Sequence, residues 1–181
     1  DAITTSVRNT AVGTEALGSA TTGNNNTAIG FKALFTNVDG DRNVAVGVGS
    51  LQTFEPSAGD TYNVAVGFDA GNKITTGVNN TLIGGLAGDA ITTGSTNTGV
   101  GKNALSATTT ASDNTAVGAE ALKTNTTAAN GTAVGYNALS SNTTGAGNTA
   151  VGRRALAANT TAANNVAVGI DAGLSVTTGV Q

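Results

Sequence analysis

The chain of 181 residues contains no Cys, His, Trp or Met, and it has only one Pro, four Phe and two Tyr. Without Cys there is no disulfide framework, and without Cys and His the usual zinc, haem and thiolate sites have no ligands. A nucleophile would depend on Lys, Asp or Glu as its base, and these residues are scattered along the chain. We therefore expect no metal, no cofactor and no catalysis.

Charge and long hydrophobic runs are also scarce. Eight Lys and Arg stand against eleven Asp and Glu, with no basic stripe among aromatic residues, so we expect no nucleic-acid partner. No hydrophobic run reaches the length of a membrane span, and we expect no membrane insertion of this segment. Few aromatic residues are typical of disordered chains, but the net charge of only -3 and the strict spacing described next argue against disorder.

The chain is a tandem repeat. Residues 1–8 form a partial unit, two regular units cover 9–42, an irregular unit with an insertion covers 43–62, and seven regular units cover 63–181. Regular units have 17 residues and the irregular unit has 20. Each of the ten full units starts with Asn, except the one that starts with Gly131. Units of this size stack as coils, so we expect one repeat domain over residues 1–181.

Positions 4 and 5 of the unit, counted from its first residue, are the most regular. Position 4 is always Val or Ile and position 5 is always Gly, which disfavours a helix and predicts a strand of five residues whose Gly lies at a bend. We expect position 4 to form the apolar core of the coil and of an oligomer. These residues are Val12, Ile29, Val46, Val66, Ile83, Val100, Val117, Val134, Val151 and Val168.

Positions 9 and 12 vary together. Position 9 is Leu in seven units and Gly in three, and the three units with Gly carry Ile74, Ile91 or Val176 at position 12. One large apolar side chain per coil is thus supplied from either of two places, as close packing requires. We further expect two short strands per coil and a ladder of position-1 Asn amides along the stack.

A coil this small has too few apolar atoms to cover both faces of its strand, with Ala on one face and Val or Ile on the other. We therefore expect an oligomer whose stacks share an apolar centre, and three chains are the natural number for a thin rod.

The motif Asn-Thr-Ala-Val-Gly-x-x-Ala-Leu, complete at 9–17, 114–122 and 148–156, resembles the head repeat of trimeric autotransporter adhesins, which also occurs in phage tail-fibre proteins. The resemblance implies an all-β, left-handed parallel β-roll, or solenoid, of ten coils assembled as an intertwined homotrimer. It also implies an extracellular place, on a bacterial cell surface or a virion tail fibre, and a host-surface protein or glycan as ligand. The unit here is longer than the usual adhesin-head unit.

Three functions are compatible with these features. The first is a structural and adhesive segment of an extracellular trimeric fibre. The second is a self-assembling filament subunit. Residues 1–6 match 89–94 in the middle of a unit, so we expect the chain to be cut from a longer fibre, and the alternative is that its open strand edges pair end to end. The third is ice binding through the Thr-Thr pairs at positions 13 and 14, although such a pair gives only one outward row and Thr hydroxyls also bond along a stack.

The irregular unit is the place where a ligand site is expected. It holds the only Pro and an insertion within residues 53–62, and five of the six aromatic residues lie between 31 and 68. Insertions in solenoids often carry binding; the alternative is a tolerated loop with aromatic residues packed beneath it. The candidate ligand surface consists of Phe54, Glu55, Pro56, Tyr62, Phe31, Phe35 and Phe68.

Overall fold

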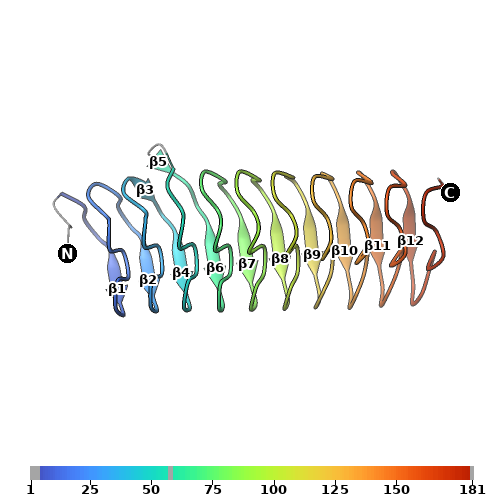
Figure 1. Ribbon diagram of the computed structural model, residues 1–181, viewed down its shortest axis with the longest axis horizontal. Coiled ribbons are helices and arrows are strands. Elements are labelled where there is room, and N and C mark those ends of the chain that lie inside the picture. The colour runs from blue at the N-terminus through green and yellow to red at the C-terminus, as the bar shows by residue number, and fades with distance from the viewer. Residues whose placement is uncertain (1–4, 57–58, 180–181) are drawn as a thin grey trace.

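A computed structural model describes residues 5–56 and 59–179. Residues 1–4, 57–58 and 180–181 lie outside this description, and with them lie part of the partial unit and part of the expected insertion. Over the described residues the protein is all-β without a helix, and its coils stack into an elongated rod with the termini at opposite ends (Figure 1). It is a parallel β-solenoid, as the repeat predicted.

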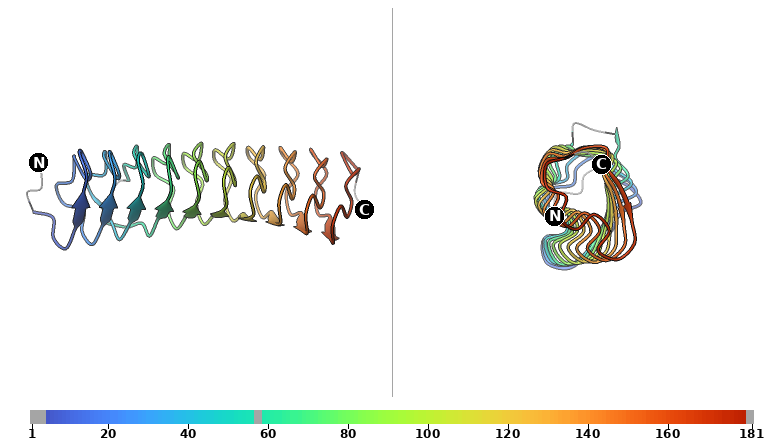
Figure 2. Two further views of the ribbon diagram at one scale, coloured as in Figure 1. Left: turned by 90° about the horizontal axis from the view of Figure 1, so that it is seen from below. Right: turned by 90° about the vertical axis from the view of Figure 1, so that its right-hand side faces the viewer.

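Each coil contributes one strand to a single ten-stranded parallel sheet that follows the rod (Figure 2). The strands of this sheet are β1 (Thr10–Val12), β2 (Thr27–Ile29), β4 (Val44–Val46), β6 (Val64–Val66), β7 (Thr81–Ile83), β8 (Thr98–Val100), β9 (Thr115–Val117), β10 (Thr132–Val134), β11 (Thr149–Val151) and β12 (Val166–Val168). Neighbouring strands pair position for position, and Val44 faces Val64 despite the longer unit between them. The insertion therefore leaves the register intact.

The strands are shorter and fewer than the sequence predicted. Each spans positions 2–4, three residues instead of five. Within residues 5–56 and 59–179, a second strand is present only where β3 (Gly40–Asp41) pairs with β5 (Gly59–Asp60). The remaining backbone still bonds from coil to coil through turns, as in the 3.0 Å bond from Leu122 N to Ala138 O. The predicted second strand of each coil is replaced by turn structure that keeps the hydrogen bonds of a stack.

Gly at position 5 ends each strand for two reasons. Gly118 has a φ of +135°, which disfavours residues with a Cβ, and a Cβ there would lie 2.5 Å from the carbonyl oxygen of Gly135 in the next coil. The chain bends at this Gly, and a turn follows. The predicted bend is confirmed, and position 6 therefore lies in the turn after the strand.

The core is filled by positions 3, 8, 9 and 12. Ala116 and Leu122 are fully buried, as are the Ile residues of the units that lack Leu. A Cβ on Gly88 would lie 2.7 Å from Leu82 Cδ2 and 2.8 Å from Ile91 Cδ1, so Leu82 and Ile91 both occupy space beside the missing Leu. The predicted exchange between positions 9 and 12 is confirmed for Ile74 and Ile91, whereas the irregular unit fills both positions, with Leu51 and Phe54. Leu at position 9 has a left-handed φ, +59° at Leu105, which Gly adopts without steric cost.

The predicted Asn ladder is present. In its regular part, Asn97 N–H donates to Asn80 Oδ1 at 3.0 Å, and Asn97 Nδ2 donates to Ala111 O at 2.9 Å. These buried amides join each coil to the preceding coil, and they also bond to the last turn of their own coil. At Gly131 the side chain is missing: Gly131 N–H still donates to Asn114 Oδ1, but Gly131 offers no amide oxygen to Asn148. The ladder is thus interrupted once.

Candidate functional site

The position-4 residues do not lie in the core of the coil, and that part of the prediction was wrong. Successive residues of a strand point to opposite faces, and Ala at position 3 takes the inward face. Val117 is 37% exposed and Val12 and Val168 at the ends are 56% and 70% exposed. The outward row is Val12, Ile29, Val46, Val66, Ile83, Val100, Val117, Val134, Val151 and Val168.

The outer face of the sheet, which we define as positions 2 and 4 of the ten strands, therefore presents an apolar row at position 4 along its whole length. Position 2 is Thr in seven strands and Val in the other three, Val44, Val64 and Val166. The face carries no charged residue, because all charged residues lie at other positions of the unit. Such a continuous uncharged surface is the strongest candidate for an interaction in this protein.

Two residues of the candidate ligand surface are buried. Phe54 is completely inaccessible at position 12, where it fills the core, and Pro56 is buried beside it. A Cβ on Gly40 would lie 2.6 Å from Pro56 Cγ and 3.0 Å from Phe54 Cε1. For Phe54 and Pro56 the ligand prediction was wrong, because these side chains pack under the small β3–β5 sheet.

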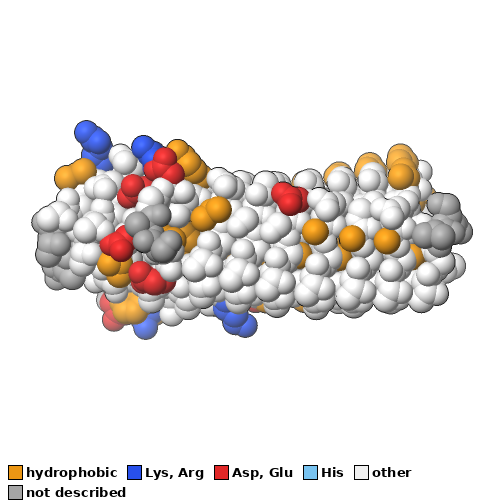
Figure 3. Space-filling model, turned by 90° about the horizontal axis from the view of Figure 1, so that it is seen from above, with side chains coloured by type: hydrophobic (Ala, Val, Ile, Leu, Met, Phe, Trp, Pro, Cys, Tyr) orange, Lys and Arg blue, Asp and Glu red, His pale blue; other side chains and the backbone are white. Residues whose placement is uncertain are grey.

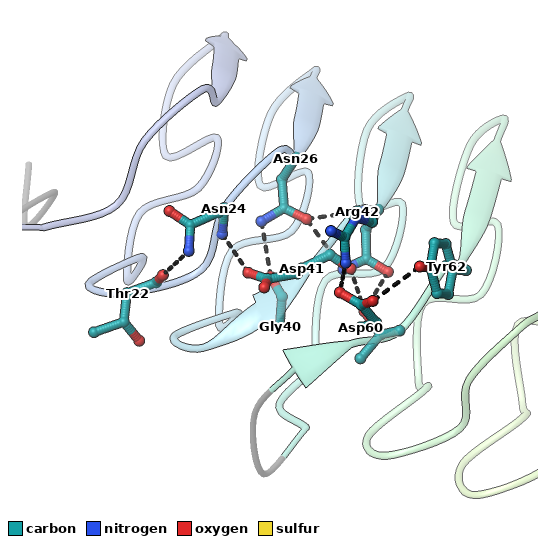
Figure 4. A network of polar contacts seen from close by, with 10 residues as sticks. Thr22, Asn24, Asn26, Gly40, Asp41, Arg42, Asp60 and Tyr62 are labelled. Atoms are coloured by element: carbon teal, nitrogen blue, oxygen red, sulfur yellow. Dashed lines mark hydrogen bonds and ion pairs between the residues drawn. The ribbon is translucent and has the colours of Figure 1, made fainter.

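Tyr62 and Glu55 are exposed near this small sheet, and Tyr62 belongs to a polar network (Figure 4). Arg42 forms an ion pair with Asp60, and the Tyr62 hydroxyl donates to Asp60 Oδ2 at 2.9 Å. The Arg42 guanidinium lies 5.7 Å from the centre of the Tyr62 ring. The network ties β5 to the preceding coil. Desolvation, followed by the charge of Asp39, raises the pKa of Glu55 above its usual value.

The remaining aromatic residues lie elsewhere. Phe31 and Phe68 are 46% and 58% exposed at position 6, beside the outer face. Phe35 is half-buried at position 10, and Lys32 Nζ lies 5.3 Å from the ring centre of Phe31 and 5.2 Å from that of Phe35. Phe31 and Phe68 thus share the position-6 row, whereas Tyr62 and Glu55 lie at other positions of the unit. On the face shown in Figure 3, charged side chains gather at the end that carries β3 and β5.

The Thr pairs have divided roles. At position 13 the hydroxyl bonds along the stack, as from Thr109 Oγ1 to Thr126 O at 3.2 Å and from Thr126 Oγ1 to Thr143 O at 3.1 Å. Position 14 is exposed. The expectation that Thr hydroxyls bond along the stack is confirmed for position 13. Each Thr pair therefore gives one outward row, at position 14.

Among residues 5–56 and 59–179, no group of three or more His, Cys, Asp or Glu is placed to hold a metal ion. The same described part of the chain has no helix with the length and hydrophobicity needed to cross a membrane.

Comparisons of the chain with protein-family models, with curated proteins and with solved structures gave no match. The similarity to adhesin-head repeats is thus carried by the repeat residues alone, and what it implies for assembly and function stays a prediction.

Proposed function

We propose that the chain is a structural and adhesive segment of an extracellular trimeric fibre, an adhesin head or a tail-fibre shaft. The main support for this proposal is the outer face, which presents Val or Ile at position 4 in every coil and has no charged residue. Association through a surface of this kind lowers the free energy, since burying apolar area is favourable. Three chains and left-handed winding come from the family resemblance.

The interior of the rod supports a mechanical role. The Asn ladder, the nearly uninterrupted backbone bonds and the constant core repeat from coil to coil, so each coil is held by its two neighbours. A stack of this kind is a stiff spacer. Three parallel copies would also multiply weak contacts of one chain into firm attachment, because linked sites raise the effective concentration of each other.

Mass in solution tests this proposal directly. Light scattering of the purified chain, with negative-stain images of the same sample, is expected to give three times the 17.4 kDa of one chain and short uniform rods. A stable monomer would overturn the shared apolar centre. Long filaments would favour the alternative function, a self-assembling extracellular filament subunit.

Ice binding is a second candidate, and one observation favours it. Position 14 presents an exposed Thr in every coil from the fourth to the tenth, namely Thr76, Thr93, Thr110, Thr127, Thr144, Thr161 and Thr178. The row is single, because the position-13 hydroxyls bond along the stack. Inhibition of ice recrystallisation at micromolar protein would favour this candidate over the adhesive fibre; we expect no inhibition.

A further inference from the structure

The position-6 row carries a second pattern, with a period of two coils. In the even-numbered coils position 6 is large: Phe31, Phe68, Lys102, Tyr136 and Ile170. In the odd-numbered coils it is Thr14, Val48, Gly85, Ala119 and Arg153, small in all but the last. All three aromatic residues of the row are thus an even number of coils apart.

The backbone holds this row in line. In each of the nine steps between coils, the N–H at position 7 donates to the position-6 carbonyl of the preceding coil at 2.9–3.1 Å; Gly49 N–H, for example, donates to Phe31 O. The alignment therefore does not depend on the exposed side chains. With about 4.8 Å between neighbouring strands, Phe31 and Phe68 lie about 9.6 Å apart along the rod, and Tyr136 lies about 19 Å beyond Phe68.

The rings are accessible and lie beside the outer face, not on it. Phe31, Phe68 and Tyr136 are 46%, 58% and 52% exposed. Gly at position 5 bends the chain between the strand and this row, so association of chains through position 4 leaves the row at the edge. Half-exposed aromatic side chains in solution retain unburied apolar area, which a ligand with apolar faces can cover.

We propose that the position-6 aromatic row binds an extended β-1,4-linked glycan, such as a cellulose or chitin chain, along the rod. In such a chain every second sugar turns the same face to one side, and the length of this disaccharide repeat is close to two coil rises. The C–H groups of a pyranose face stack on aromatic rings, while hydroxyls at the rim bond to polar groups. Each ring has such a polar neighbour at position 7: Lys32, Asp69 and Asn137.

The spacing selects this ligand among glycans. An α-1,4-linked glucan coils and does not repeat its sugar faces along a straight line, so it cannot meet rings that are multiples of two coils apart. The row has Lys102 and Arg153 but no acidic residue, and the uncharged cellulose and chitin chains are not repelled by these two cations. This inference rests on the proposed adhesive role and specifies its ligand.

The test measures binding to insoluble cellulose and chitin and, by calorimetry, to their soluble hexasaccharides, with amylose as the control polymer. We expect binding to a β-1,4-linked glycan and not to amylose. Phe68→Ala is expected to weaken binding about tenfold, which corresponds to about 1.4 kcal/mol, and Phe31→Ala with Phe68→Ala to abolish it. Val48→Ala is the matched control, because Val48 lies in the same row with 45% exposure, close to the 46% of Phe31, but lies out of the two-coil period.

A register variant decides whether spacing matters. Val48→Phe with Phe68→Val keeps the composition but brings the two Phe rings one coil apart, and we expect at least a tenfold loss of affinity. Equal binding by this variant, or equal binding of amylose, would overturn the inference. Light scattering on the same samples separates it from the proposed function: a trimer that binds no β-1,4-linked glycan refutes the ligand alone, whereas a monomer refutes the shared apolar centre.

Discussion

The inward and outward faces of one three-residue strand differ in burial. In β9, Ala116 is fully buried and its neighbour Val117 is 37% exposed, although Val is the more hydrophobic residue. The inward position 3 is Ala in eight of the ten strands, because Leu and position-12 residues already occupy the interior; Leu82 is fully buried there in the coil whose position 9 is Gly88. The outward face has no such limit. The space left by the other core residues, and not hydrophobicity alone, decides what lies inside a coil.

A charge on the inward face is expected to have the largest effect. Ala116→Asp places a carboxylate in a closed apolar core, where an unpaired charge costs several kcal/mol. We expect loss of the folded rod, seen as loss of the β signal in circular dichroism and as insoluble protein. A soluble folded rod would contradict the assignment of position 3 to the core.

The same charge one residue later is expected to act on assembly. Val117→Asp places the carboxylate on the outer face, where water can reach it in a separate chain, but where a shared apolar centre would bury it. We expect unchanged circular dichroism and a fall in mass from trimer to monomer by light scattering. Val117→Thr is the matched control, since it keeps the shape without a charge and should retain the trimer. A Val117→Asp variant that remains a trimer would contradict the proposed packing.

The exchange between positions 9 and 12 can be tested by removing a core side chain at position 9 and adding one at position 12 of the same unit. Leu105→Gly removes a buried side chain and is expected to lower the free energy of unfolding by about 3 kcal/mol. Adding Thr108→Ile should recover most of this loss, because the unit then carries Gly at position 9 and Ile at position 12, as the unit of Gly71 and Ile74 does, and because the buried Thr108 hydroxyl has no hydrogen-bond partner. Denaturant unfolding measures both. No recovery in the double variant would disprove the exchange.

Completing the Asn ladder is expected to give a smaller gain. Gly131→Asn supplies an amide oxygen to the Asn148 backbone N–H, and a typical hydrogen bond of this kind adds about 1 kcal/mol. Gly131→Ala is the control, since it adds a Cβ without an amide. A higher melting temperature is expected for the Asn variant only. Equal shifts in both variants would mean that the Cβ, and not the ladder, is responsible.

The smallest expected effect is on the pH dependence of stability. Since the folded-state pKa of Glu55 is raised above 4.5, folding favours its protonated form. Its contribution to stability is complete below about pH 4.5 and is lost as the pH rises through the folded-state pKa. In unfolding curves measured over a series of pH values, Glu55→Gln should reduce this fall in the free energy of unfolding. An unchanged slope would show that Glu55 is solvated.

Part of the candidate site was beyond sequence reasoning. Phe54 and Tyr62 belong to the same irregular unit, yet Phe54 occupies a core position and Tyr62 lies exposed beside Arg42 and Asp60. The unit position of Phe54, 12, was a usable signal, since this position supplies core residues in other units. The pairing of β3 with β5 had no such signal, because two Gly-Asp pairs on successive coils give no hydrophobic pattern.

The sequence by itself determined the periodic features: the coil length, the parallel register, the Gly bend, the Asn ladder and the exchange between Leu and Ile. Each of these depends on the same position in successive units, which a repeat displays directly. Only the tertiary structure decided which side of the strand is inside and how long the strand is. The reason is steric, since both faces carry apolar residues and only the room left by Leu and Asn in a closed coil distinguishes Ala from Val.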